Sequence, residues 1–174
     1  MEDKRLKYAD KISLERIEKL HPSIRNKVKE TYLNINMKLP TGVRLRIAQG
    51  LRTVAEQDAL YAQGRTTKGK IVTNAKGNTS WHNYGLAVDI VLLYDLDGNG
   101  SFETASWDEN KHWMMVVNEF KKAGFSWGGD FKSIYDSPHF EMIFGLTTSI
   151  AQSRLKAGDV ITDSGMKYIN INKG

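Results

Sequence analysis

The sequence of 174 residues contains no cysteine. Disulfide bridges, thiolate zinc sites and cysteine nucleophiles are therefore excluded, so any zinc must be held by histidine and carboxylate ligands. Long apolar runs are missing as well, and the N-terminal segment MEDKRLKYADKISLERIEKL fits neither a signal peptide nor a membrane span. We therefore expect a protein that is synthesised in the cytoplasm without a signal peptide and does not insert into a membrane.

Hydrophobic residues make up 40% of the chain and charged residues 26%, which is ordinary for a globular protein. The length predicts one domain over residues 1–174. The formal charge of +5 favours a polyanionic partner such as nucleic acid, anionic lipid or cell wall bearing teichoic acid, although the same charge also serves solubility alone. Because no nucleic-acid recognition motif is present, we expect no nucleic-acid partner.

The N-terminal part of the sequence predicts two helices between Ser13 and about Ile35. Ser13 is a candidate N-cap of the first helix, and His21-Pro22 interrupts the helical pattern. Four apolar residues of the second helix recur at helical spacing and should face the core: Ile24, Val28, Tyr32 and Ile35.

The middle of the chain alternates between strand and helix signals. Apolar and basic residues alternate over 43–47, which predicts a half-buried strand. Thr53 and Glu56 form a capping box that opens a helix. Residues 64–80, rich in Gly, Thr, Lys and Asn, predict a long loop, and the apolar run 84–94 predicts a central buried strand.

The remaining signals complete an α+β fold. A second capping box at Ser106 and Glu109 predicts a helix that runs to about residue 122. Short strands and turns should fill residues 125–145, with a further helix near 148–156 and a strand near 166–172. Helices come first and strands are then mixed with helices, which predicts helices packed on a small, mainly antiparallel sheet.

Two of the four histidines lie in unusual surroundings. Asp89 falls inside the apolar strand, where an unpaired carboxylate is costly to bury, and His82 precedes that strand closely. With His139, the set provides two imidazoles and one carboxylate, which is a zinc site that leaves a fourth position for water. Asp136 and Glu141 flank His139, so one could be the general base and the other a supporting partner. A hydrogen-bonded His–Asp pair without metal would give the same pattern.

The motif around His82 is similar to the signature SxHxxGxAxD of a zinc peptidase superfamily. It consists of Ser80, His82, Gly85, Ala87 and Asp89. This superfamily contains the VanY-like D-alanyl-D-alanine carboxypeptidases and the L-alanyl-D-glutamate endopeptidases. Further segments resemble the endolysin and sporulation-type L-alanyl-D-glutamate peptidases, namely residues 50–66, 72–75, 82–85, 127–130 and 136–141. The resemblance covers about residues 12–145 and leaves 146–174 as a C-terminal extension of undetermined role.

The resemblance implies a zinc site in a surface cleft. His82, Asp89 and His139 would ligate Zn²⁺, and Asp136 would be the catalytic base. It also implies that Arg52 binds a substrate carboxylate and helps to polarise the scissile carbonyl, which suits a planar guanidinium.

Two further residues would bind the substrate. Ser80 would hydrogen-bond it, whereas Gln57 would either contact it, support Arg52 or simply face solvent. Trp81 and Trp127 are candidates for the cleft wall, although buried aromatic residues more often belong to a core.

The implied activity is hydrolysis of peptidoglycan stem peptides, at the L-Ala–D-Glu bond. One alternative is a D-Ala-D-Ala carboxypeptidase or dipeptidase, and another is a non-catalytic, zinc-containing module that binds the cell wall. The expected partner is the anionic cell wall, with the protein acting as a monomer. Without a signal peptide, a holin-type pore would release an endolysin of this kind from the bacterial host cytoplasm, whereas a muropeptide-processing enzyme would stay there.

An acidic turn resembles the first part of an EF-hand loop. Its candidate Ca²⁺ ligands are Asp95, Asp97, Asn99, Ser101 and Glu103. The twelfth position is Ser106 rather than the bidentate Glu of a complete loop, so an acidic, glycine-rich turn without calcium is the alternative.

Overall fold

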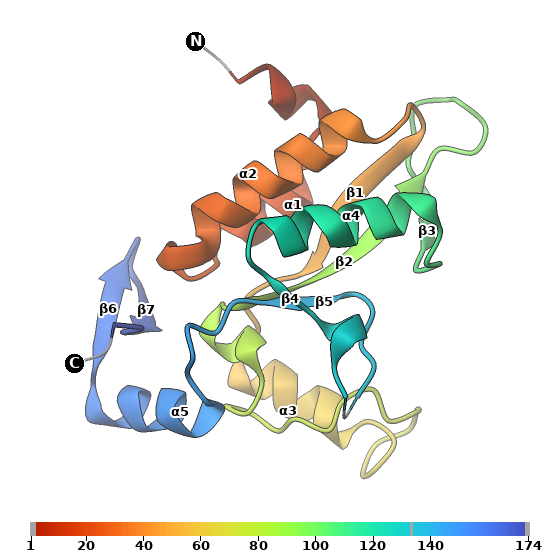
Figure 1. Ribbon diagram of the computed structural model, residues 1–174. Coiled ribbons are helices and arrows are strands. Elements are labelled where there is room, and N and C mark those ends of the chain that lie inside the picture. The colour runs from red at the N-terminus through yellow and green to blue at the C-terminus, as the bar shows by residue number, and fades with distance from the viewer. Residues whose placement is uncertain (1–2, 133, 173–174) are drawn as a thin grey trace.

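The computed structural model describes residues 3–132 and 134–172 (Figure 1). Its larger sheet has the strand order β1-β2-β5-β4, with β3 also paired to β2. These strands are β1 (Val43–Gln49), β2 (Ala87–Tyr94), β3 (Thr104–Ser106), β4 (Ser126–Trp127) and β5 (His139–Glu141). All of their pairings are antiparallel, which confirms the predicted α+β class with an antiparallel sheet.

The central strand β2 organises the sheet. It pairs with β1 along one edge, while β3 and β5 share its other edge. Six of its eight residues are buried, as the apolar run predicted, but the strand begins at Ala87 rather than at residue 84. The preceding residues form a short 3₁₀ helix instead, η2 (Trp81–Tyr84), which carries His82.

Helices α1 (Lys11–Glu18), α2 (Pro22–Lys38) and α4 (Lys111–Lys122) pack together with β1 and β2, while α3 (Val54–Ala62) lies on the opposite side of the molecule from α2 (Figure 1). Two more 3₁₀ helices are η1 (Lys4–Tyr8) and η3 (Gly128–Asp130). The predicted stripe of α2 is confirmed, because Ile24, Val28, Tyr32 and Ile35 are fully buried. None of the helices in the described residues combines the length and apolarity of a membrane span.

The predicted N-cap of the first helix is wrong by three residues. Asp10 caps α1, and its carboxylate accepts a hydrogen bond from the backbone N–H of Ser13 at 3.0 Å. Ser13 is fully buried, and its hydroxyl accepts a hydrogen bond from the backbone N–H of Ile47 in β1 at 2.9 Å. Asp is as good an N-cap as Ser, so the first of two suitable residues caps the helix and the second ties it to the sheet.

The second capping box is also wrong, whereas the first, at Thr53 and Glu56, is confirmed. Ser106 is the last residue of β3 and pairs with Leu92, so its backbone is already committed to the sheet. Helix α4 begins four residues later than Glu109 would require, because the side chain of Asn110 caps it by accepting from the N–H groups of His112 and Trp113.

The C-terminal segment folds onto the rest of the chain. The predicted helix is α5 (Thr148–Ala157) and the predicted strand is β7 (Met166–Ile169), which pairs with the unexpected β6 (Val160–Asp163). His21 donates a hydrogen bond to the carbonyl of Ile169 at 2.9 Å, and Arg25 pairs with Asp163 at 2.6 Å. Because Ile169 lies in the same buried cluster as residues of α1, α2 and the sheet, the C-terminal segment shares their core.

Candidate metal centre and its cleft

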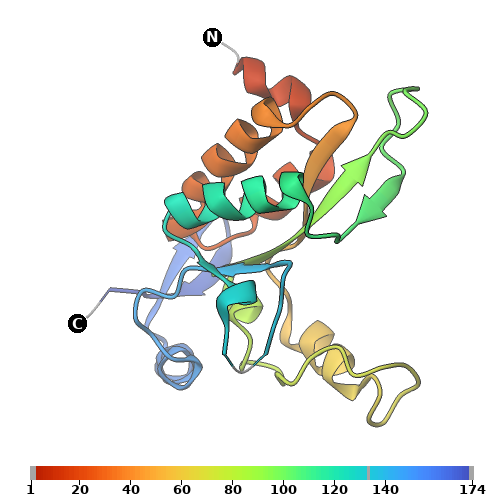
Figure 2. The ribbon, with the colours of Figure 1, turned by 45° about the vertical axis from the view of Figure 1, so that its right-hand side comes forward.

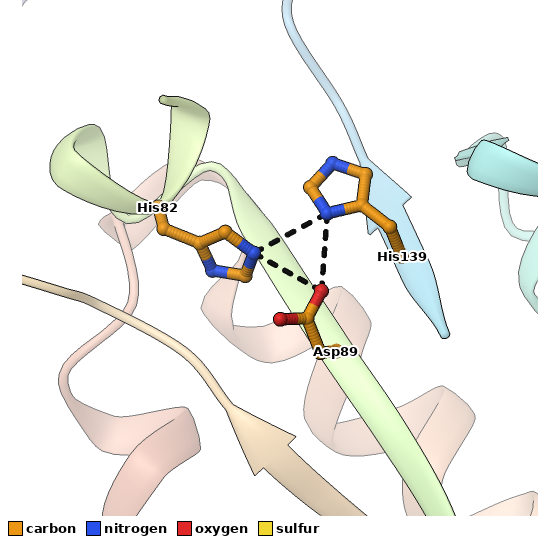
Figure 3. A group of neighbouring side chains, drawn as sticks. All are labelled: His82, Asp89 and His139. Atoms are coloured by element: carbon orange, nitrogen blue, oxygen red, sulfur yellow. Dashed lines mark hydrogen bonds and ion pairs between the residues drawn. The ribbon is translucent and has the colours of Figure 1, made fainter. Parts of the chain in front are cut away.

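Three side chains from three elements converge on one point (Figure 3). The Nε2 atom of His82 lies 3.1 Å from Oδ1 of Asp89 and 3.2 Å from Nδ1 of His139, which itself lies 3.1 Å from that Oδ1. Asp89 in β2 stands directly opposite His139 in β5 in the strand register. Across residues 3–132 and 134–172, no other group of three or more His, Cys, Asp or Glu side chains converges closely enough to hold a metal ion.

A tight turn brings His82 to this point. Gly85 ends η2 with a φ of +67°, and a Cβ atom there would lie 2.8 Å from the backbone nitrogen of His21. Only glycine adopts this conformation without strain and fits so close to another backbone. Strand β2 begins two residues after this turn, at Ala87, and the change in chain direction lets His82 face Asp89.

Hydrogen bonds fix the ring orientation of both histidines. Nδ1 of His82 donates to the carbonyl oxygen of Gly50 at 2.8 Å, which leaves Nε2 free to face the convergence point. In His139, Nε2 donates to Oε2 of Glu141 at 2.9 Å, which leaves Nδ1 facing the same point. Of the two carboxylates that flank His139 in sequence, Glu141 is therefore the supporting partner.

The electrostatics of the cluster favour a bound cation. Burial opposes ionisation of Asp89, but the two imidazoles outweigh it and hold the pKa of that carboxyl below its usual range. Burial alone would lower the pKa of His139, but its hydrogen bonds to Asp89 and Glu141 raise it to about 10. In the metal-free protein a proton therefore occupies the ring nitrogen that a metal ion would use.

The convergence point opens into a cleft of about 620 Å³. One wall is the loop segment 71–75, and the other includes Phe131, Ile134 and Pro138. Ser80 and Arg52 both line the cleft. The predicted metal ligands thus lie in a surface cleft, as the resemblance implied.

Arg52 is held beside the candidate metal ligands. Its Nη2 atom lies 3.5 Å from Oδ2 of Asp89, and its side chain is only 12% exposed. Nη1 donates to Oε1 of Gln57 at 2.8 Å. Gln57 is fully buried and does not line the cleft, so the prediction that it contacts substrate is corrected: it holds Arg52 from behind. Its amide also donates to the carbonyl of Ala75 at 2.7 Å, which connects Arg52 to the cleft wall.

Asp136 presents a half-buried carboxylate to the cleft. Among the described residues no donor makes a hydrogen bond to this carboxylate, and burial together with the charge of Asp89 raises its pKa. Its backbone is anchored to Gly128, whose carbonyl accepts from the Asp136 N–H at 3.1 Å. A Cβ atom on Gly128 would lie 2.2 Å from the Asp136 carbonyl oxygen, so this close approach requires glycine.

The two tryptophans have different positions. Trp81 lines the cleft, whereas Trp127 is buried in the core. The indole N–H of Trp127 donates to the carbonyl of Ser137 at 2.7 Å and so anchors the segment that carries Asp136.

The acidic turn between β2 and β3 does not form a cluster of carboxylates. Asp95 accepts hydrogen bonds from the backbone N–H groups of Asn99 and Gly100, and Asn99 accepts from the N–H of Ser101. Within residues 3–132 and 134–172, Asp95, Asp97 and Glu103 do not form a group of three carboxylates close enough to hold one metal ion. Calcium binding at this turn stays a prediction.

Sequence reasoning did not find the apolar cleft walls. Ile71 and Val72 on one side and Ile134 on the other are at least half exposed. They occur in segments without helical or strand periodicity, and although Val72 falls in a segment that resembles the peptidases, that resemblance does not say which residues line the cleft. Gly50 orients His82 through its carbonyl, and the sequence did not predict this role because every residue has a backbone carbonyl.

Comparisons with known proteins find relatives of one superfamily. The family whose model matches residues 73–142 is described as D-alanyl-D-alanine carboxypeptidase. The chain is 45% identical over 109 residues to the peptidoglycan L-alanyl-D-glutamate endopeptidase CwlK of Bacillus subtilis (strain 168), covering 59% of this chain and 62% of that protein. It is 27% identical over 147 residues to the L-alanyl-D-glutamate peptidase of Listeria phage A118, covering 76% and 46%.

A solved structure, that of the Serratia marcescens L-Ala D-Glu endopeptidase ChiX, matches with 23% identity and a TM-score of 0.49, covering 77% of this chain and 88% of that chain. The chain thus spans less than two thirds of the length of the curated relatives it matches. The sequence matches confirm the resemblance to the VanY-like peptidase superfamily.

Proposed function

We propose that this protein is a zinc peptidase that hydrolyses the L-Ala–D-Glu bond in peptidoglycan stem peptides. The observation that carries the proposal is the convergence of His82, Asp89 and His139 in a cleft that also presents Arg52 and Asp136. The choice of bond is supported by the two curated relatives, both of which are named for L-alanyl-D-glutamate cleavage.

The donor set fits zinc. Two imidazoles and one carboxylate form a known ligand set of catalytic zinc, and the edge of a tetrahedron with metal bonds of about 2.05 Å is about 3.3 Å. The three donor atoms lie 3.1 to 3.2 Å apart, so they need to separate only slightly to hold the ion. When bound there, zinc would acidify water and polarise a carbonyl.

Asp136 is suited to be the general acid and base. Its carboxylate faces the cleft, and its raised pKa brings it closer to neutrality, where a group exchanges protons efficiently. It would take the proton from the attacking water and deliver it to the nitrogen of the leaving amine. Because no described donor occupies its oxygens, both remain available for this exchange.

Arg52 would bind the oxygen that gains negative charge, or a carboxylate of the stem peptide. Its position is fixed by Gln57, so little rotamer freedom is lost when substrate binds. Ser80 lies in the same cleft and would donate a hydrogen bond from its hydroxyl to the peptide. The apolar walls would exclude water from the scissile bond.

A D-Ala-D-Ala carboxypeptidase is the second candidate, and the description of the matching family favours it. The same residues would serve either bond, so the products decide. A non-catalytic zinc module is disfavoured because it has no use for the carboxylate of Asp136 in the cleft beside the metal ligands.

The experiment is digestion of purified peptidoglycan, followed by mass spectrometry of the soluble products. Reactions with the purified protein, with a chelator, and with zinc restored after chelation are run beside the matched variant Asp136→Asn. Zinc-restored release of peptides with a new N-terminal D-Glu, or its amide, supports the proposal. Release of D-Ala alone establishes the carboxypeptidase instead, and a zinc-loaded protein without products points to the binding module.

Several finer expectations belong to this proposal. The protein would act as a monomer with one peptidase domain over residues 1–174, and phage-type release through a holin pore would bring it to the wall, as its likeness to the phage A118 peptidase suggests. Calcium at Asp95, Asp97, Asn99, Ser101 and Glu103 would stabilise the turn, which a shift in melting temperature on adding calcium to chelated protein would reveal.

A further inference from the structure

The short helix η2, which carries His82, is held in place at both ends. At its C-terminal end, the carbonyl oxygen of Gly85 accepts a hydrogen bond from the backbone N–H of His21 at 3.0 Å. Before its start, Asn78 adopts a left-handed φ of +63°, which is uncommon for a residue other than glycine. The direction in which the chain enters η2 therefore depends on the contacts that fix Asn78 in this conformation.

Three side chains satisfy the backbone of Asn78. Its N–H donates to Oδ1 of Asn83 at 3.0 Å, and its carbonyl oxygen accepts from the hydroxyl of Tyr84 at 2.8 Å. Both of these residues belong to η2 itself. The third side chain is that of Gln152 in α5, whose Nε2 donates to the same carbonyl oxygen at 2.9 Å. Because Gln152 is 74 positions away in the sequence, it ties this turn to a distant part of the fold.

The C-terminal segment gives Gln152 a firm base. Ala151, its neighbour in α5, is fully buried in the core that the segment shares with the sheet. The segment also reaches the other end of η2, because the carbonyl of Ile169 in β7 accepts from the ring of His21, whose backbone binds Gly85. Both ends of η2 are thus connected to the C-terminal segment.

This segment lies outside the cleft. No described residue after Glu141 lines the cleft. Figure 2 shows α5 and the β6–β7 hairpin, in blue, apart from α3 and the loop that follows it, in yellow, which project on the other side of the molecule. A residue of α5 can therefore affect the chemistry only through the residues that it holds in position.

We propose that Gln152 is a positioning residue for the zinc centre. Its hydrogen bond to Asn78 fixes the entry to η2, and this sets the position of the His82 ring further along the chain. The inference rests on the proposed function, and it gives the C-terminal extension, whose role the sequence leaves undetermined, a part in the site. Without Gln152 the Asn78 carbonyl keeps Tyr84 as a donor, so the turn should loosen rather than unfold.

The first test compares the zinc affinity of the wild type and of Gln152→Leu by competition with a chromophoric chelator. Leucine has a similar size and lacks the donor, so zinc affinity should fall about fivefold. In the protein loaded with Co²⁺, the visible absorption bands report the ligand geometry, and they should shift in the variant because His82 is displaced. With saturating zinc, kcat on a soluble stem peptide should fall about tenfold.

The matched control is Asp163→Ala in β6. Asp163 fastens the same C-terminal segment to α2 through its ion pair with Arg25 at 2.6 Å, and it does not contact the Asn78 turn. The control should therefore lose stability in urea unfolding and keep the zinc affinity, the cobalt spectrum and the kcat of the wild type. A difference between the two variants separates a role in positioning from a role in folding alone.

A double variant tests whether Gln152 acts through Asn78. Tyr84→Phe removes the other donor to the Asn78 carbonyl, so either single variant leaves one donor in place. In the double variant that carbonyl has neither donor. Its loss of zinc affinity, expressed as a free energy, should therefore exceed the sum of the two single losses.

Three results would overturn the inference: a Gln152→Leu variant with the zinc affinity and cobalt spectrum of the wild type, a loss no larger than that of Asp163→Ala, or losses in the double variant that simply add. Metal binding is measured without peptidoglycan, so the outcome is separate from that of the proposed function. A wild type that depends on Gln152 for zinc binding and releases no peptide defeats only the proposed function. A wild type that releases peptide, together with an unaltered Gln152→Leu variant, defeats only the inference.

Discussion

Replacement of Glu141 by glutamine should weaken zinc binding without changing the shape of the site. The Glu141 side chain is 12% exposed and its Oε2 accepts from His139 at 2.9 Å, so solvent screens its charge little. In Glu141→Gln the amide oxygen still accepts this hydrogen bond, and only the negative charge is lost. Carboxylate partners of metal-bound histidines typically contribute about 10- to 100-fold in affinity, which is about 1.4 to 2.8 kcal/mol.

The same substitution also favours zinc binding in one respect, because it weakens the competition between zinc and a proton for His139. In the metal-free wild type the pKa of His139 is about 10, so zinc must displace one proton, and affinity should rise about tenfold per pH unit between pH 6 and 9. Loss of the Glu141 charge lowers that pKa, so the variant should stop gaining affinity at a lower pH. The ratio of wild-type to variant zinc affinity should therefore be smallest near pH 6 and should grow towards pH 9.

Competition with a chromophoric chelator across this pH range measures both effects. The matched control is Glu119→Gln on α4, a carboxylate 18% exposed that pairs with Lys38 outside the cleft. The reasoning is refuted if Glu141→Gln binds zinc within threefold of the wild type at pH 9, or if the wild-type affinity does not depend on pH.

Other substitutions separate chemistry, positioning and folding. Asp136→Asn should lower kcat by about 10²- to 10⁴-fold and leave zinc affinity unchanged, and a variant that also loses zinc would contradict the assignment of Asp136 as the base. Gln57→Leu removes the hydrogen bond to Arg52, so kcat/KM should fall at least about tenfold while zinc still binds; unchanged kinetics would show that Arg52 needs no support. Gly85→Ala forces a φ of +67° on alanine and a clash with the His21 backbone, so the protein should lose about 1 to 3 kcal/mol of stability in urea unfolding, and an unchanged midpoint would disprove the strain.

Local sequence signals predicted an element correctly where the element depends only on residues close to one another in the chain. The apolar stripe of α2 and the capping box at Thr53 and Glu56 are examples, because each depends on residues within one or two turns. The box at Ser106 failed although its residue types are suitable. The backbone of Ser106 pairs with Leu92, fourteen positions earlier in the chain, and no local pattern reports that pairing.

The candidate ligands were predictable for a related reason. His82 and Asp89 belong to one short motif, and His139 stands in a second motif of its own. The residue pattern alone left the roles of Asp136 and Glu141 open, and only the resemblance implied that Asp136 is the base. Which carboxylate supports His139 depends on which one reaches the distal nitrogen of that ring, and this is a contact of the folded chain. The burial of Gln57 could not be predicted from the sequence either. The local sequence pattern does not distinguish a glutamine on an exposed helix surface from one that is buried and supports another side chain.

The separation of the ligands along the chain has a consequence for unfolding. His82 and His139 are 57 residues apart in sequence, on elements that meet only in the folded protein. One ion shared by both histidines would act as a reversible cross-link, and a covalent link that closes a loop of this length would remove about 4 kcal/mol of chain entropy from the unfolded state. A chain without cysteine would thereby gain a stabilising cross-link that is present only when zinc is bound. Metal withdrawal would then cost the protein its resistance to proteases and heat as well as its chemistry.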